Sequence, residues 1–200
     1  MRKPLQRSSA AALAVGFAVL LAATACEPAP PPEPPAGSAL VGCARAGERI
    51  ELTATSHLDP DCTYTGGFDI RSSGVTLDCL GATVRSAPGA GGRGILVEAP
   101  AGVALHDVTV RNCRVEGFLN SLRVTRQGFR DLAPDEEYDA TTANIRIEGN
   151  DLSGSRGVGI FVDGYVSGVT VTGNQVHRAG SSGIYLETGS RRSAVTGNVI

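Results

Sequence analysis

The sequence has few aromatic residues and no excess of charge of either sign. Tryptophan is absent, aromatic residues make up 4% of the chain, and 18 basic residues are balanced by 20 acidic ones. This balance provides no positive field for nucleic acid, so we exclude a nucleic-acid partner. None of the chain's repeat units carries apolar residues at positions i, i+3, i+4 and i+7 over a useful length, which argues against a helical fold. The 26 glycines, together with abundant valine, isoleucine and threonine, are typical of many short strands joined by tight turns.

The N-terminus has the features of an export signal. A basic stretch with Arg2, Lys3 and Arg7 precedes an apolar run at residues 11–25. This run is too short to span a membrane and ends in small residues, as a cleaved signal does. We therefore assign residues 1–25 to a signal peptide, which predicts export.

Cys26 follows this segment directly, within the stretch LAATAC. The stretch resembles the lipobox of bacterial lipoproteins, whose cysteine carries the lipid and becomes the mature N-terminus. Ala23-Thr24-Ala25 is also an ordinary cleavage site, so secretion without a lipid is the alternative. Cysteine parity favours lipidation, because the chain has five cysteines and setting Cys26 aside leaves an even number for disulfides. The resemblance implies lipid anchoring to the bacterial cell envelope, with the membrane as a partner.

A proline-rich linker is predicted at residues 26–39. Six of the eleven prolines lie between residues 27 and 38. Such a segment cannot pack and is expected to form an extended tether. The folded domain then covers residues 40–200, about 160 residues, which is enough for a single core.

The domain is built from a repeat. Three segments align without gaps around a Gly-Ile pair: RGILVEAP from Arg93, VGIFVDGY from Val158 and SGIYLETG from Ser182. A second set aligns as GVTLDCLG, DVTVRNCRV, NIRIEGNDL, GVTVTGNQV and SAVTGNVI. Short strands in such repeats bury the same face in every unit only if the units stack, each strand pairing in parallel with its equivalent in the next unit. The charged insertion at residues 127–142 is expected to be a surface excursion.

This pattern resembles the right-handed parallel β-helix repeat proteins, a group that includes pectate lyase-like enzymes. The Gly-Ile runs and the x-Gly-Asn steps carry the resemblance, which extends over residues 43–200. It implies an all-β fold, a right-handed parallel β-helix. Because the chain ends at Ile200 in the middle of a coil and natural solenoids cap their ends, we expect a solenoid that is incomplete at the C-terminus.

The recurrent x-Gly-Asn step predicts a structural asparagine ladder. Asparagine tolerates unusual backbone angles at a sharp turn and hydrogen-bonds nearby main chain. Stacked coils place equivalent residues about 4.8 Å apart, within reach of one another's amides. We therefore expect the side chains of Asn150, Asn174 and Asn198 to hydrogen-bond in a row.

The cysteines fit the same register. Cys113 aligns with the ladder position, and Cys79 lies within a residue of it in the preceding coil. Adjacent coils bring Cα atoms into disulfide range. We therefore predict a Cys79–Cys113 disulfide, which leaves Cys43 and Cys62 to form a second one.

Strand alternation predicts one outward strip along the Gly-Ile runs. It stacks aromatic residues beside carboxylates, and its members are Phe161, Asp163, Tyr185 and Glu187, preceded in earlier coils by Leu96, Glu98, Arg123 and Thr125. Further candidates lie in the turns: His177, Arg178, Arg191 and Arg192. In β-helix enzymes the comparable face binds sugar chains, which implies that these carboxylates place calcium or move protons and that the arginines contact uronates or sulfates. An ordinary solvated surface is the alternative.

The sequence contains none of the catalytic signatures that would decide its activity. Adjacent aspartates with a Gly-His-Gly are absent, as are Asp-Pro-His, a serine-hydrolase elbow, a phosphate loop and Cys-His zinc spacing. The sequence therefore predicts no metal site and no firm cofactor, calcium being the one that the resemblance implies. Enzyme activity stays undecided. Two functions remain: a cell-envelope protein that binds or processes an acidic polysaccharide, and a non-catalytic adhesion or structural scaffold.

Overall fold

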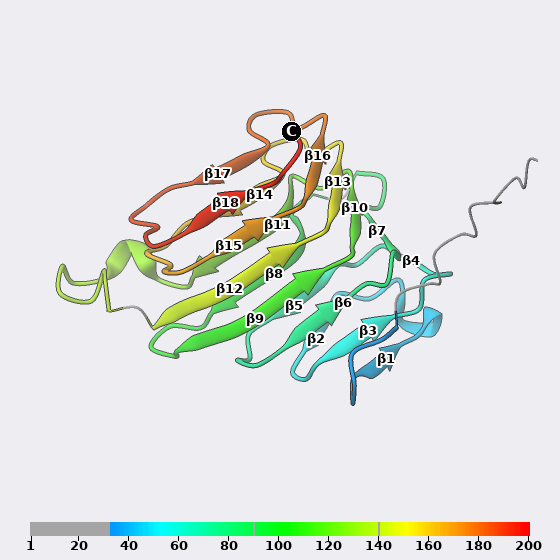
Figure 1. The fold of residues 1–200 in the computed structure, drawn as a ribbon, viewed down its shortest axis with the longest axis horizontal. Helices are drawn as coiled ribbons and strands as arrows, with labels where there is room; N and C mark the ends of the chain where they lie inside the picture. Colours follow the sequence, from blue (N-terminus) through cyan, green and yellow to red (C-terminus); the bar gives the residue numbers. More distant parts are fainter. Residues whose placement is uncertain (1–32, 90, 140) are drawn as a thin grey trace, which may run out of the picture. The chain divides into compact units, whose positions relative to one another are not determined.

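The computed structural model describes residues 33–89, 91–139 and 141–200 (Figure 1). The predicted signal peptide, Cys26 and the first half of the predicted linker lie outside the described residues. Within the described part of the chain, no helix has the length and apolarity needed to cross a membrane. The first strand begins at Ala39, and the hydroxyl of Ser38 hydrogen-bonds Nδ1 of His57 at 2.7 Å. The folded part thus begins within the last residues that were assigned to the linker.

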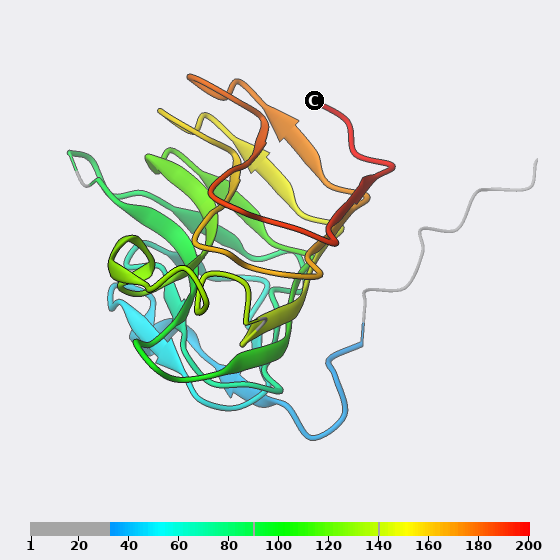
Figure 2. The same ribbon diagram turned by 90° about the vertical axis from the view of Figure 1, so that its left-hand side faces the viewer.

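The chain winds through three parallel sheets in turn, and between residues 56 and 186 each coil adds one strand to each sheet (Figures 1 and 2). Sheet A contains, in spatial order, β1 (Ala39–Val41), β3 (Ser56–Leu58), β6 (Thr76–Asp78), β9 (Leu105–Arg111), β12 (Thr142–Glu148), β15 (Thr170–Thr172) and β18 (Ala194–Thr196). Sheet B contains β2 (Ile50–Leu52), β5 (Phe68–Ile70), β8 (Arg93–Ala99), β11 (Asn120–Arg126), β14 (Ile160–Val162) and β17 (Ile184–Leu186). Sheet C contains β4 (Thr63–Tyr64), β7 (Thr83–Arg85), β10 (Arg114–Glu116), β13 (Asp151–Ser153) and β16 (Gln175–His177). Two short 3₁₀ helices interrupt the described coils: η1 (Cys43–Arg45) and η2 (Phe129–Asp131). The predicted parallel β-helix is confirmed.

The core is a set of stacked columns inside the coils. Every second side chain of a strand points inward, and parallel register places equivalent residues above one another. In sheet B one column consists of Ile50, Phe68, Ile95, Leu122, Ile160 and Ile184. All but the last are buried, and burial of each such side chain contributes roughly 1.5–3 kcal/mol.

The asparagine ladder runs along one inner corner of the coils. Nδ2 of Asn150 donates to Oδ1 of Asn174 at 2.9 Å, and Nδ2 of Asn174 donates to Oδ1 of Asn198 at the same distance. Asn150 and Asn174 are buried. The preceding Gly149 and Gly173 have φ of +62° and +63°, where a residue with a side chain would be strained. The x-Gly-Asn step is therefore a corner in which glycine makes the turn and asparagine ties it to the next coil.

Both predicted disulfides are present. Cys43 and Cys62 have Cα atoms 5.4 Å apart, and the Cα atoms of Cys79 and Cys113 are 4.7 Å apart. The main-chain N–H of Cys113 donates to Oδ1 of Asn150 at 3.0 Å, so this cysteine continues the ladder into the preceding coil. The Cys79–Cys113 disulfide therefore links the N-terminal end of the ladder to the coil that contains Cys79.

Replacing Asn174 with alanine is expected to destabilise the domain. Oδ1 of Asn174 accepts hydrogen bonds from both N and Nδ2 of Asn150; in the variant the buried N–H would lose its partner and Nδ2 would keep only its bond to the Val110 carbonyl. We expect the free energy of unfolding to fall by about 2–4 kcal/mol, measured by denaturant titration with circular dichroism. The exposed neighbour Gln175 provides the control, since Gln175→Ala should change stability by less than about 0.5 kcal/mol. Equal losses in the two variants would contradict a stabilising role for the ladder.

Candidate functional site

The outward side chains of sheet B form two adjacent columns. The first column consists of Glu51, Asp69, Leu96, Arg123, Phe161 and Tyr185. The second begins with the paired residues Glu98 and Thr125. Main-chain hydrogen bonds from Asp163 to Val124 and from Glu187 to Val162 place those two acidic residues next in the second column. The register therefore aligns the residues of the predicted strip.

The first column ends in an aromatic stack. The rings of Phe161 and Tyr185 lie nearly parallel, with centroids 5.6 Å apart and planes inclined by 7°. The guanidinium carbon of Arg123 lies 5.1 Å from the centroid of the Phe161 ring. Tyr185 is 43% exposed, and a hydrogen bond to Glu187 raises the pKa of its hydroxyl above the ordinary value. The stack thus presents an accessible aromatic surface.

Asp163 is not the solvent-facing carboxylate that strand alternation predicted. Its side chain is 0% exposed, and it accepts two hydrogen bonds from Arg123, from Nε at 3.1 Å and from Nη2 at 2.6 Å. Its neighbourhood is covered by a contact with the insertion, which the strand pattern alone does not show. The next residue, Gly164, packs beneath Phe129 of the insertion, whose ring atoms lie 3.2 Å from where a Cβ of Gly164 would be. Asp163 therefore orients Arg123 instead of meeting a ligand directly.

A cavity of about 330 Å³ opens between these columns and the insertion. Its floor is formed by Glu98, Arg123 and Thr125, and its wall by residues 126–131, which include η2. Of the predicted strip, Glu98, Arg123 and Thr125 line this cavity directly. Strand pairing makes Thr125 the direct neighbour of Glu98, and Arg123 lies two residues before Thr125 on the same face.

The charged side chains around the cavity are paired. Arg71 donates two hydrogen bonds to Oε2 of Glu98, at 3.2 and 3.0 Å. Burial disfavours the charge of Arg71, but its hydrogen bond to Glu98 and nearby carboxylates raise its pKa above the usual value. Arg126 is buried and donates to both carboxylate oxygens of Asp139, at 3.1 and 3.0 Å. Burial opposes ionisation of Asp139, but hydrogen bonds from Thr141 and Arg126 hold its pKa below the ordinary value.

Thr125 is the unusual group in the cavity floor. It is 4% exposed, and its Oγ1 has no hydrogen-bond partner within the described residues. Buried hydroxyl groups are normally hydrogen-bonded, so an orphan in a cavity wall indicates a position where a ligand atom or solvent completes the bonding. The sequence placed Thr125 on the outward face, but no sequence signal marks an unsatisfied hydroxyl.

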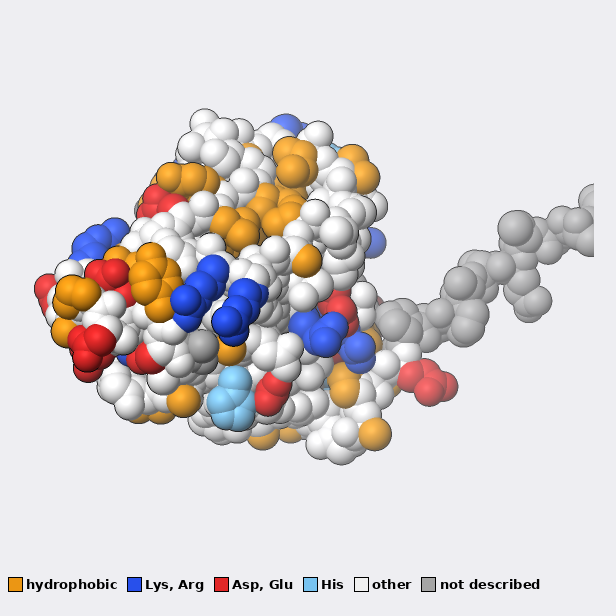
Figure 3. Space-filling model, turned by 60° about the vertical axis from the view of Figure 1, so that its left-hand side comes forward, with side chains coloured by type: hydrophobic (Ala, Val, Ile, Leu, Met, Phe, Trp, Pro, Cys, Tyr) orange, Lys and Arg blue, Asp and Glu red, His pale blue; other side chains and the backbone are white. Residues whose placement is uncertain are grey.

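The insertion at residues 127–142 is anchored to the coils and does not simply project from them. Phe129 is buried and packs edge-on against Tyr165, with ring centroids 6.4 Å apart. Tyr138 also meets Tyr165 edge-on, at 5.2 Å. The guanidinium of Arg191 lies 4.6 Å from the Tyr138 ring centroid and donates to the Tyr138 carbonyl. Figure 3 shows this end of the molecule, where hydrophobic, basic and acidic side chains are interleaved.

A comparison with protein families identifies the architecture. A family model described as "Right handed beta helix region" matches residues 61–200. The chain belongs to the right-handed β-helix family. Searches of curated proteins and of solved structures gave no match. Membership of this β-helix family is compatible with polysaccharide-related and structural roles, since one scaffold carries different activities.

The remaining predicted residues of this β-helix lie outside the cavity. His177 is on β16 in sheet C, Arg178 follows it in a turn, and both are exposed. Arg192 is exposed in the turn after sheet B. Arg191 lies in that same turn, where its side chain holds Tyr138. The predicted arginine contacts with a ligand therefore fall on positions away from the cavity.

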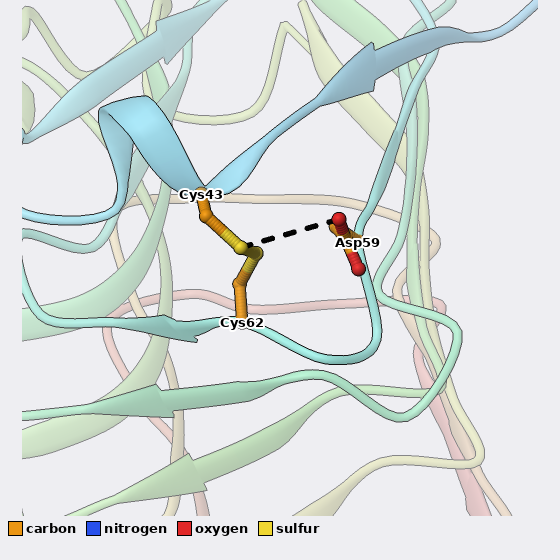
Figure 4. Close-up of side chains that lie close together, drawn as sticks. All are labelled: Cys43, Asp59 and Cys62. Carbon is orange, nitrogen blue, oxygen red and sulfur yellow. Dashed lines mark hydrogen bonds between the residues drawn. A yellow bond between two sulfur atoms is a disulfide. The ribbon is translucent and has the colours of Figure 1, made fainter.

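One group of the β-helix has the donor atoms of a metal site but a different role. Candidate ligand atoms of Cys43, Asp59 and Cys62 lie within 4.8 Å of one another (Figure 4). The two sulfur atoms are joined in a disulfide, so neither is the thiolate that binds metals. Oδ1 of Asp59 accepts a hydrogen bond from the N–H of Asp61 at 3.0 Å. The role of this group is structural, since the Cys43–Cys62 disulfide cross-links the N-terminal coil.

Removing only one partner of the Arg123–Asp163 ion pair is expected to destabilise the folded protein strongly. Asp163→Ala leaves a largely buried guanidinium without its partner, which should lower the free energy of unfolding by about 3–5 kcal/mol. Replacing both residues with apolar ones, as in Arg123→Met with Asp163→Leu, should recover most of that loss. Chemical denaturation of the three proteins checks this. A double variant as unstable as the single one would contradict the assignment to charge pairing.

The anchoring of the insertion is testable through its arginine contact. In Arg191→Ala the contact with Tyr138 is lost, and we expect amide hydrogen exchange in residues 127–142 to become several-fold faster, measured by mass spectrometry. Arg192→Ala is the matched control, because its side chain is exposed in the same turn, and it should leave the exchange unchanged. Unaltered exchange in Arg191→Ala would mean that Arg191 does not hold the insertion.

Proposed function

We propose that this protein is an exported β-helix lipoprotein of the cell envelope that binds a polysaccharide on the outer face of sheet B. The observation that carries the proposal is the direct contact between a polar cavity and an aromatic surface. Arg123 lines the cavity and also stacks on Phe161, which stacks on Tyr185. Sugars present both hydroxyl groups and apolar ring faces, and protein sites of this kind combine a few placed polar groups with aromatic side chains.

The shape of the face supports a polymeric ligand. Its columns run along the solenoid axis with about 4.8 Å between equivalent residues of successive coils. An extended chain can therefore contact several coils at once, in the way that other solenoids use their long surfaces. The export signal, Cys26 and the proline-rich linker support a location at the cell envelope. The two disulfides are typical of an oxidising compartment.

Binding, and not bond cleavage, is the activity that we propose. The sequence suggested three carboxylates for proton transfer or calcium: Glu98, Asp163 and Glu187. Glu98 is held by Arg71, and Asp163 is buried against Arg123. A general acid or base has to reach the reacting group, and calcium needs several free oxygen ligands. Asp163 does not line the cavity, Glu98 has a single oxygen unpaired within the described part of the chain, and Glu187 is hydrogen-bonded to the hydroxyl of Tyr185 outside the lining.

A structural or adhesive scaffold is the second candidate. The observation in its favour is the continuous internal bonding of the solenoid, with an asparagine ladder that one disulfide extends. Such a rigid body suits a spacer or a display surface as well as a binding protein. In this second candidate the anchored insertion would contact another protein and no glycan would bind.

A glycan array tests the proposal. The mature chain with Cys26→Ser, which keeps the protein in solution, is expected to bind at least one class of polysaccharide. Tyr185→Ala should weaken that binding by about tenfold, because the open side of the aromatic stack is removed. Leu119→Ala is the control, since Leu119 is an exposed hydrophobic residue outside sheet B, and binding should persist. Absence of binding to every acidic and neutral glycan would overturn the proposal in favour of the scaffold.

A further inference from the structure

The charges around the cavity cancel one another. Three ion pairs are Arg71–Glu98, Arg123–Asp163 and Arg126–Asp139, with N–O distances of 3.0, 2.6 and 3.0 Å. The other two charged residues of the lining, Arg130 and Asp131, have opposite signs. The cavity and its supporting partners therefore carry no net charge.

An acidic ligand would find no free cation in the cavity floor. Arg123, the guanidinium there, already meets both oxygens of a buried carboxylate. A second anion would have to share that guanidinium with Asp163 and would lie beside Glu98. Asp163 already offsets the charge of Arg123, so the open Nη1 can donate a hydrogen bond without an unbalanced positive charge that would favour an anion.

What remains is a set of unused hydrogen-bonding atoms. Both bonds from Arg71 end on Oε2 of Glu98, which leaves its Oε1 without a partner in the described part of the chain. Arg123 uses Nε and Nη2 toward Asp163, and its Nη1 makes no hydrogen bond with the described residues. Together with the orphan Oγ1 of Thr125, which lies just beneath the surface of the floor, the lining holds one acceptor, one donor and one group that can do both.

The three residues are neighbours on the outer face of sheet B. Thr125 and Glu98 are paired across neighbouring strands, about 4.8 Å apart. Arg123 and Thr125 point to the same side from alternate positions of one strand, about 6.6 Å apart. A hydroxyl group both donates and accepts a hydrogen bond, so two neighbouring hydroxyls can satisfy all three protein groups.

We propose that this cavity binds an uncharged sugar residue of a neutral glycan through two adjacent hydroxyl groups. One hydroxyl donates to Oε1 of Glu98 and accepts from Nη1 of Arg123, and the other bonds Oγ1 of Thr125. This inference rests on the proposed polysaccharide binding and adds the class of ligand. The proposed ligand is neutral, whereas the arginines in the turns suggested an acidic glycan; those arginines lie outside the cavity.

The test compares neutral and acidic probes on the full mature chain carrying Cys26→Ser. Isothermal titration would use hexasaccharides of neutral β-1,4-glucan and β-1,4-mannan and a hexamer of galacturonate. We expect a neutral hexamer to bind and the galacturonate hexamer not to bind. Thr125→Val should weaken the neutral hexamer about tenfold without lowering the unfolding midpoint, because it removes an unsatisfied buried hydroxyl. Thr170→Val, on the outer face of sheet A, is the matched control and should leave affinity unchanged.

The substitution Glu98→Gln is expected to change the affinity for neutral and for acidic ligands in opposite directions. A neutral ligand that donates to the carboxylate loses a charge-assisted bond and should bind more weakly. An acidic ligand would bind more tightly, because a like charge is removed.

The outcomes distinguish this inference from the proposed function. Binding of galacturonate alone would overturn the inference and leave polysaccharide binding intact. Neutral binding that is unaffected by Thr125→Val and Glu98→Gln would overturn the assignment to this cavity. Failure of every glycan to bind would overturn the proposed function, and the inference with it.

Discussion

Parallel hydrogen bonding between equivalent residues of successive coils is the interaction on which the rest of this molecule depends. It stacks the same side-chain position in every turn, so a single asparagine per coil forms a buried ladder through Asn150, Asn174 and Asn198. Side chains alternate between the two faces of a strand, so a slip of one residue would turn Phe161 and Tyr185 into the core. The ladder and the Cys79–Cys113 disulfide oppose such a slip.

The candidate site lies where the repeat is interrupted. An uninterrupted solenoid has open, nearly flat faces, and a flat face does not enclose a ligand. The insertion at residues 127–142 adds a wall beside sheet B, and its aromatic contacts with Tyr165 and Arg191 hold that wall in place. The regular coils thus supply a rigid floor, and the irregular segment supplies the enclosure.

Ion pairing changes the chemistry that the outer face offers. A strip of carboxylates and arginines suggests calcium or acidic glycans when its residues are considered one at a time. In the folded chain Arg71 engages Glu98 and Arg123 engages Asp163. These pairs neutralise one another and orient the remaining donor and acceptor atoms. Recognition by this face would accordingly depend on hydrogen bonds and on the aromatic stack more than on net charge.

The sequence alone determined the features that repeat: the parallel β-helix, the asparagine ladder, both disulfide pairings and the alignment of Phe161 with Tyr185. They are predictable because each depends on local alternation and a fixed interval. Only the tertiary structure decided that Asp163 is buried, that Arg191 holds Tyr138, and that the hydroxyl of Thr125 is unsatisfied. These depend on how a non-repeating insertion packs against distant turns, and contacts of that kind leave no periodic trace in the sequence.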